Sequence, residues 1–233
     1  MKTNILVLLF TLFAAGVFSA YGQGTVVVVD PTKTADEALL SKADEAVFNK
    51  ALPAVRKHVA EACTEEVEIS GIAHGAFSKP GAKQTIVFYQ YCQTGNGLGW
   101  VGIVLMENGR VVGNFIDESG WSVDAGSLPD INQNGLDEFT LSYGGGMHQG
   151  QGGIGVDIME FSNGIPKGIG WFQAEKFDDT QSTTVWKVTA TPGKIPVYYK
   201  QKYFSGEDEK YRRIGAVAKL RLTEATSKFV VVK

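Results

Sequence analysis

Short runs in which apolar and polar residues alternate dominate the chain from Glu66 to the C-terminus. Valine, isoleucine, threonine and aromatic residues recur in these runs and glycine separates them, which is typical of antiparallel strands. Two separators, ENGR (107–110) and SNGI (162–165), carry the Asn-Gly pair that favours tight hairpins. The runs are EVEISGIA, QTIVFYQYC, WVGIVLM, RVVGNFI, EFTLSY, GIGVDIMEF, TTVWKVTA, IPVYYKQKYF and IGAVAKLRL. This pattern predicts a mainly β protein.

A helical pattern precedes the strands. Thr34 and Glu37 have the S/T-x-x-E spacing of a capping box, so we expect a helix to begin there. An apolar stripe at helical spacing follows, formed by Leu39, Leu40, Ala43, Ala46 and Val47. We expect this stripe to pack on the protein's own sheet, and docking on a partner is the alternative. Pro53 kinks or restarts the helix. Upstream, TVVVVD (25–30) is an extended segment or a first strand.

The strand runs repeat along the chain. AFSKPGAKQTIVFY (76–89) aligns with DINQNGLDEFTLSY (130–143) at an offset of 54. IVLMENGRVV (103–112) aligns with VDIMEFSNGIP (156–166), which matches Glu107 with Glu160, and TPGKIPVYY (191–199) is a weaker third copy. A period of this length is typical of propeller blades or stacked β-meanders. We predict an open, propeller-like stack of two to three antiparallel four-stranded units with an N-terminal helical segment. A β-sandwich or an irregular barrel is the alternative.

The N-terminus has the layout of a secretory signal peptide. A single lysine, Lys2, precedes an apolar run, and the small residues Ala20 and Gly22 precede a cut before Gln23. A membrane anchor is the alternative, because the run is near the lower limit for spanning a bilayer. We therefore expect an exported protein, periplasmic or secreted, with no integral membrane segment after cleavage.

The predicted organisation is a signal peptide (1–22), an extended segment and helix (23–65), and a β-repeat region (66–233) that forms one domain with the helix. The units of the β-repeat region lie at about 66–118, 119–175 and 180–233. The net charge of −3 lacks the basic excess that a nucleic-acid partner would require.

Cys63 and Cys92 are the two cysteines of the chain. Export places them in an oxidising compartment, so we expect a disulfide between the end of the helical segment and the first clear strand. Two separate buried thiols are the alternative.

Oxygen-bearing side chains stand at every second position from Asp130 to Asn134 in DINQNGLDEF (130–139), and the two acids Asp137 and Glu138 follow. Calcium prefers about six to eight oxygen ligands, which one loop can supply at alternating positions. The candidate ligands are the side chains of Asp130, Asn132, Asn134 and Glu138 and the backbone carbonyl of Leu136. The glutamate that closes an EF-hand loop is absent, because Leu141 stands at its place, and a strand follows rather than a helix.

This stretch resembles the calcium loop of FG-GAP/VCBS repeats, which build integrin-type β-propellers with the pattern D-x-[DN]-x-[DN]-G-x-x-D. The match covers Asp130, Asn132, Asn134, Gly135 and the acid at Glu138, where the family has aspartate. The resemblance implies that these positions coordinate calcium and fix the turn of a blade. The aligned loop SKPGAK (78–83) has no carboxylate, so at most one unit binds metal. We expect weak affinity, about 10⁻⁴–10⁻³ M. A turn of Asn and Asp residues that cap their own backbone is the alternative.

Other candidate chemistry is sparse. In the glycine-rich stretch YGGGMHQGQGGIG (143–155), His148 and Gln149 form a candidate ligand loop, and a plain flexible connection is the alternative. No phosphate loop, zinc motif or nucleophile elbow is present. Asp157 and Glu160 alternate faces of one strand, so they are poor catalytic partners. We expect them and the acids at 117–118 and 178–179 to be solvated surface residues.

These features favour an exported, non-catalytic β-repeat module that binds a protein or glycan ligand and holds one structural calcium ion. The alternative is a periplasmic or secreted hydrolase that acts on a glycan or envelope substrate with acids from separate strands. A third interpretation is a subunit that completes its open stack by forming a homo-oligomer.

Overall fold

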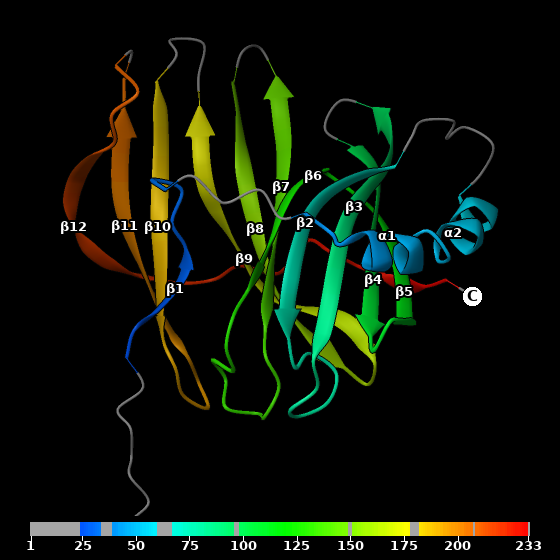
Figure 1. Ribbon diagram of the computed structural model, residues 1–233. Helices are drawn as coiled ribbons and strands as arrows, with labels where there is room; N and C mark the ends of the chain where they lie inside the picture. Colours follow the sequence, from blue (N-terminus) through cyan, green and yellow to red (C-terminus); the bar gives the residue numbers. More distant parts are fainter. Residues whose placement is uncertain are drawn as a thin grey trace, which may run out of the picture.

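The computed structural model describes residues 24–33, 39–59, 67–95, 98–148, 151–177, 182–206 and 208–232. The prediction of a mainly β protein is confirmed, because these residues form two antiparallel sheets flanked by short helices (Figure 1). The apolar and polar alternation identified the strands because successive side chains of a strand point to opposite faces.

The smaller sheet has five strands in the order β13-β5-β4-β3-β2. These strands are β2 (Glu68–Gly75), β3 (Gln84–Gly95), β4 (Leu98–Glu107), β5 (Arg110–Ser119) and β13 (Val230–Val231). The larger sheet has eight strands in the order β12-β11-β10-β9-β8-β7-β6, with β1 paired to β10. These are β1 (Val26–Val29), β6 (Trp121–Ser127), β7 (Phe139–His148), β8 (Gln151–Ser162), β9 (Ile165–Phe177), β10 (Thr183–Thr191), β11 (Val197–Ser205) and β12 (Arg212–Leu220).

The predicted repeat units correspond to consecutive strands of the structure. The first predicted unit contains β2 to β5, and the second contains β6 to β9, so each is a set of neighbouring antiparallel strands. The third contains β10 to β12, which extend the larger sheet away from the smaller one, and β13, which joins the smaller sheet (Figure 1). The two sheets meet where Gly71 of β2 crosses β6. A Cβ atom on Gly71 would lie 2.1 Å from the backbone nitrogen of Ala125, so only glycine fits there.

The predicted Asn-Gly hairpins are confirmed. Asn108 and Gly109, between β4 and β5, have φ angles of 50° and 70°. Asn163 and Gly164, between β8 and β9, have φ angles of 53° and 75°. Two successive positive φ angles are the geometry of a type I′ turn, whose twist suits a two-residue connection.

The main core lies between the two sheets. Aromatic pairs bridge it, with ring centroids 5.4 Å apart for Phe88 and Tyr143 and 5.7 Å apart for Phe115 and Phe161. Both pairs are edge-to-face, the arrangement that the ring quadrupole favours. The cluster also contains Ala73, Phe77, Ile86, Val101, Ile103, Leu105, Ala125, Phe139, Leu141, Met159 and Phe229. A further core lies on the opposite face of the larger sheet, around Val156, Ile158 and Phe172.

Two short helices cover the outer face of the smaller sheet (Figure 1). They are α1 (Lys42–Phe48) and α2 (Leu52–His58), and Phe48 packs edge-to-face on Tyr89 of β3 with centroids 5.2 Å apart. The expectation that the helical stripe packs on the protein's own sheet is confirmed for Val47. No helix in the described part of the chain has the length and apolar character needed to cross a bilayer.

The predicted start of the helix at Thr34 and Glu37 lies outside the described residues, which resume at Leu39. Leu39 is non-helical and 80% exposed, so it is no part of the packed stripe. The helix begins after Ser41, whose hydroxyl accepts a hydrogen bond of 3.1 Å from the Asp44 backbone N–H. A serine at this position satisfies one of the free amide groups of the first turn.

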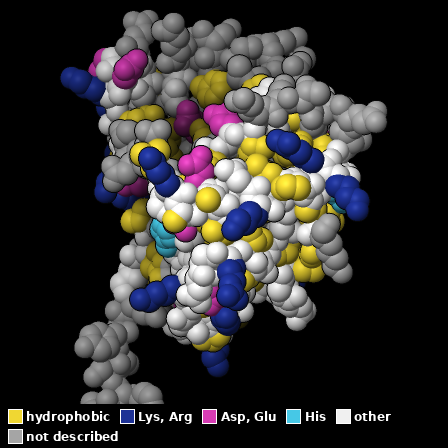
Figure 2. All heavy atoms as spheres, turned by 45° about the vertical axis from the view of Figure 1, so that its right-hand side comes forward, with side chains coloured by type: hydrophobic (Ala, Val, Ile, Leu, Met, Phe, Trp, Pro, Cys, Tyr) yellow, Lys and Arg dark blue, Asp and Glu magenta, His cyan; other side chains and the backbone are white. Residues whose placement is uncertain are grey.

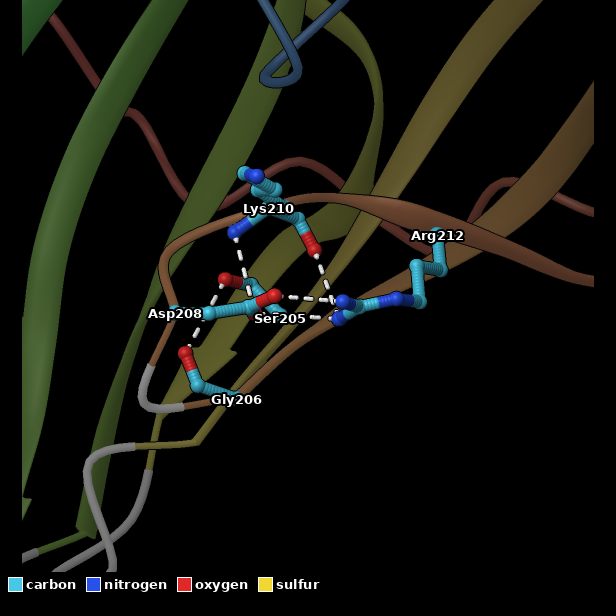
Figure 3. A network of polar contacts seen from close by, with 5 residues as sticks. All are labelled: Ser205, Gly206, Asp208, Lys210 and Arg212. Carbon is cyan, nitrogen blue, oxygen red and sulfur yellow. Dashed lines mark hydrogen bonds and ion pairs between the residues drawn. The ribbon is translucent and has the colours of Figure 1, made fainter.

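Charged side chains are distributed over the surface. Figure 2 shows Lys and Arg side chains scattered over one face among hydrophobic and uncharged atoms, rather than gathered into one basic patch. At the β11–β12 turn, Arg212 pairs with Asp208, which also accepts a hydrogen bond of 3.4 Å from the Lys210 backbone N–H (Figure 3). These groups are exposed, so their contribution to stability is small.

Candidate metal centre

The loop from Asp130 to Glu138 connects β6 to β7 and folds around the side chain of Asp130. The Asp130 carboxylate accepts hydrogen bonds from the backbone N–H groups of Asn134 (3.0 Å) and Gly135 (2.8 Å). Gly135 has a φ of 92°, which glycine adopts without strain. The sequence therefore forms a tight loop whose backbone N–H groups hydrogen-bond the Asp130 carboxylate.

In each of the two asparagines of the loop, both the oxygen and the nitrogen of the side-chain amide form hydrogen bonds. Asn132 Oδ1 accepts from the backbone N–H of Asn134 (3.0 Å), and Asn134 Oδ1 accepts from that of Leu136 (2.8 Å). Both Nδ2 groups donate to one atom, Glu160 Oε2, at 3.0 and 3.1 Å. A half-turn of either amide exchanges its nitrogen and oxygen, so the same positions can present oxygen ligands.

Glu160 belongs to this site, although the sequence analysis expected it to be a solvated surface acid. It lies on β8, and its carboxylate reaches the loop across the end of the sheet. The prediction that Asp157 and Glu160 face opposite sides of the strand agrees with their contacts, since Asp157 bonds the C-terminal segment instead. The alignment of Glu160 with Glu107 was the available signal. Glu107 directly precedes the Asn108-Gly109 turn, and Glu160 lies three residues before Asn163 of the other Asn-Gly turn.

Glu138 is the most buried acid of the loop, with 1% of its surface exposed. Its Oε2 accepts a hydrogen bond of 2.6 Å from the Ile131 backbone N–H. Its Oε1 is buried and has no hydrogen-bond partner among the described residues. The pKa of Glu138 is raised to about 7, mainly by burial and also by the charges of Asp130 and Glu160, against the opposing effect of backbone hydrogen bonds.

The carboxylates at this loop form no ion pair with a side chain of the described residues, although Lys167 of β9 stands in register with Glu160. None of the ion pairs found there involves Asp130, Glu138 or Glu160. No group of three or more His, Cys, Asp or Glu in the described ranges has a metal-holding arrangement either. A cation here would therefore take amide and backbone oxygens as well as carboxylates, as calcium does. Asp137 takes no part, because it accepts a hydrogen bond of 2.7 Å from the Ala76 backbone N–H.

The other predicted site residues are only partly described. Cys92 is 2% exposed on β3 and is not a free thiol, whereas Cys63 lies outside the described residues, so the pairing stays a prediction. His148 ends β7, where its side chain is outside the description, and Gln149 is outside it altogether. The candidate ligand loop therefore remains a prediction.

Two acids expected at the surface are buried instead, which corrects that part of the sequence analysis. Asp157 is fully buried and Asp117 is 9% exposed. Both accept backbone hydrogen bonds from the C-terminal segment, which lies over them. The acids at 178–179 lie outside the described residues.

Comparison of the chain with protein-family models, with curated proteins and with solved structures gives no match.

Proposed function

We propose that this chain is an exported, non-catalytic binding module whose loop from Asp130 to Glu138 holds a structural calcium ion. Glu160 is an additional ligand in this proposal, beside Asp130, Asn132, Asn134, Glu138 and the carbonyl of Leu136. The two four-stranded meanders would be blade-like units of the FG-GAP/VCBS type, and the ion would fix the turn of the second. A protein or glycan is the expected ligand of the module.

The observation that carries the calcium proposal is a difference between the two units. In the first unit, Gln84 stands at the position of Glu138, and its Oε1 accepts a hydrogen bond of 2.9 Å from the Ser78 backbone N–H. The carboxylate of Glu107, which aligns with Glu160, receives the Lys79 ammonium at 2.9 Å and the Gln84 amide at 3.3 Å. The first unit thus supplies its own cation and a neutral amide.

The second unit has the corresponding positions but lacks the lysine and the neutral amide of the first. Glu138 carries a carboxyl where the first unit has an amide, and Gln133 stands where the first unit has Lys79. Asp130 adds a third carboxylate. Like charges enclosed together are destabilising unless a proton or a cation neutralises them. A calcium ion would neutralise carboxylates in the second unit, as Lys79 neutralises Glu107 in the first.

Calcium would act on stability by binding the folded loop alone. The loop has no preformed ligand set in the unfolded chain, so ligand binding shifts the equilibrium toward the folded state. We expect the thermal midpoint of residues 23–233 to rise with calcium and to fall in EDTA. An Asp130→Ala variant should lose the calcium response.

A matched control is available in the first unit. Glu107→Gln changes the residue that aligns with Glu160 and removes the partner of Lys79. It should leave the calcium response intact, whereas Glu160→Gln should weaken it. If millimolar calcium shifts the midpoint of none of these proteins, the loop is an Asn/Asp turn and the calcium proposal fails.

A further inference from the structure

A cavity of about 860 Å³ lies between β1 and β6, and none of the proposed calcium ligands lines it. Its floor is the outer face of β7, β8 and β9, and part of its wall is formed by Leu39 and Leu40, which precede α1. Its size falls in the range of small-molecule sites, about 300–1,000 Å³.

Apolar side chains form much of the floor and rim of the cavity, beside the polar Thr140 and Ser142 of β7. Ile154, Val156 and Ala174 line the floor. At the rim, Val27 is 49% exposed, Val123 is 41% exposed and Leu39 is 80% exposed. Clustered exposed apolar side chains around a cavity are favourable contacts for an apolar ligand.

Two half-buried carboxylates lie on opposite sides of this apolar surface. Asp124 belongs to β6 and Glu175 to β9, so three strand spacings separate them, roughly 14 Å across the sheet. Within the described ranges neither has an ion-pair partner, and burial raises the pKa of both. This separation exceeds the roughly 5–10 Å between the carboxyl groups of a glycosidase.

The other charged groups of the cavity do not neutralise these acids. Asp30 is paired with Lys187 at 2.8 Å. Lys33 is exposed, and Glu45 adds a further negative charge. The cavity therefore combines an apolar interior with an excess of negative charge.

We propose that this cavity binds an elongated apolar ligand that carries a primary amine, with the ammonium group against Asp124. Asp124 pairs in register with Ser142 on β7, and both line the cavity. An ammonium group has three donors, which a carboxylate and a neighbouring hydroxyl can accept. The hydrocarbon body lies along the floor toward Glu175. The inference rests on the proposed binding role and is independent of calcium.

The test is calorimetric titration of residues 23–233 with dodecylamine, dodecanoate and dodecanol, each below its micelle concentration. The three probes share one chain and differ in the charge of the head group. Dodecylamine should bind at least about tenfold more tightly than dodecanoate, because the carboxylate of the latter faces Asp124. Asp124→Asn should lower the affinity for dodecylamine about tenfold and leave that for dodecanol unchanged.

Glu118→Gln serves as the matched control, because Glu118 is exposed and does not line the cavity. Its affinity for dodecylamine should equal that of the unchanged protein. Thermal melting of each variant reports whether the fold is retained. The Asn side chain has nearly the shape of Asp, and Asp124→Ser offers a second variant if Asp124→Asn does not fold.

Equal affinity for the amine and the carboxylate, or an affinity for the amine that Asp124→Asn does not change, would overturn the assignment of a cationic ligand. Absence of binding by all three probes would overturn it as well. If any of these results is found while the calcium response is intact, the cationic-ligand proposal fails and the calcium proposal stands. If the calcium response is absent while amine binding is selective, the calcium proposal fails and the cationic-ligand proposal stands.

Discussion

The carboxylate of Asp157, on β8, accepts a hydrogen bond of 2.9 Å from the backbone N–H of Ser227, 70 residues further along the chain. Thr226 donates to the same carboxylate from its backbone N–H (3.1 Å) and its hydroxyl (2.9 Å). Ser227 in turn hydrogen-bonds Tyr143 at 2.8 Å. One buried carboxylate thus holds the C-terminal segment against the core between the sheets.

Replacement of Asp157 should be strongly destabilising. Asp157→Ala leaves the buried donors of Ser227 and the more exposed donors of Thr226 without their acceptor, so we expect a loss of about 3–5 kcal/mol in the free energy of unfolding. Urea denaturation measures this change. Glu118→Ala, at an exposed acid, should change it by less than about 0.5 kcal/mol. A similar small loss for Asp157→Ala would show that the C-terminal segment is not held by this carboxylate.

Glu138 should make the metal-free protein less stable as the pH rises. Its folded pKa of about 7 lies above the ordinary value of 4.5, so the folded protein binds this proton more tightly than the unfolded chain does. The stability that the proton provides is fully present below about pH 4.5 and is lost as the pH rises through 7. Glu138→Gln should remove this dependence and give the loop the neutral amide that Gln84 provides in the first unit.

The measurement is urea denaturation in EDTA at several pH values between 4.5 and 8, with the variant beside the unchanged protein. Burial also raises the pKa values of Asp117, Asp124 and Glu175, but these groups are common to both proteins and cancel in the difference. A difference that does not grow with pH would contradict the position assigned to the Glu138 proton. Calcium should stabilise the unchanged protein more at pH 8 than at pH 5, because it binds the ionised carboxyl.

Gly71 should tolerate no side chain. In Gly71→Ala the added Cβ would lie 2.1 Å from the Ala125 nitrogen, so β2 and β6 would have to separate, at a cost of about 1–3 kcal/mol or more. Thermal and urea denaturation report the loss. Gly145→Ala is the matched control, because a Cβ there meets nothing within 4 Å. Equal stability of the two variants would show that the crossing of β2 and β6 is loose.

The predicted disulfide should be visible in the oxidised protein. Intact-mass measurement after alkylation without reductant should show no modified thiol, and alkylation after reduction should show two, matching the two cysteines of the chain. Cys92→Ala should lower the free energy of unfolding by about 3 kcal/mol, the value for a closed loop of this length in the chain-entropy model. Alkylation of the unreduced, unfolded protein would contradict the bond.

Much of the secondary structure follows from local sequence signals. The alternating runs identify strands because the side-chain period of a strand is two, and the Asn-Gly pairs identify turns because both residues accept positive φ. The sequence analysis did not identify the cap at Ser41, where α1 begins, and its predicted start at Thr34 lies outside the described residues. The helix that forms is the part whose apolar side chains meet the smaller sheet.

By itself the sequence determined that this chain is mainly β, where its tight turns lie, and that the loop from Asp130 to Glu138 is rich in oxygen ligands. These properties depend on neighbouring residues. The tertiary structure decided that Asp157 is buried under the C-terminal segment, and that Glu160 joins the loop. It also decided that Lys79 pairs with Glu107 in the first unit, whereas no ion pair among the described residues involves Glu160 in the second. Burial and charge balance depend on which distant segments meet, and strand periodicity does not encode that.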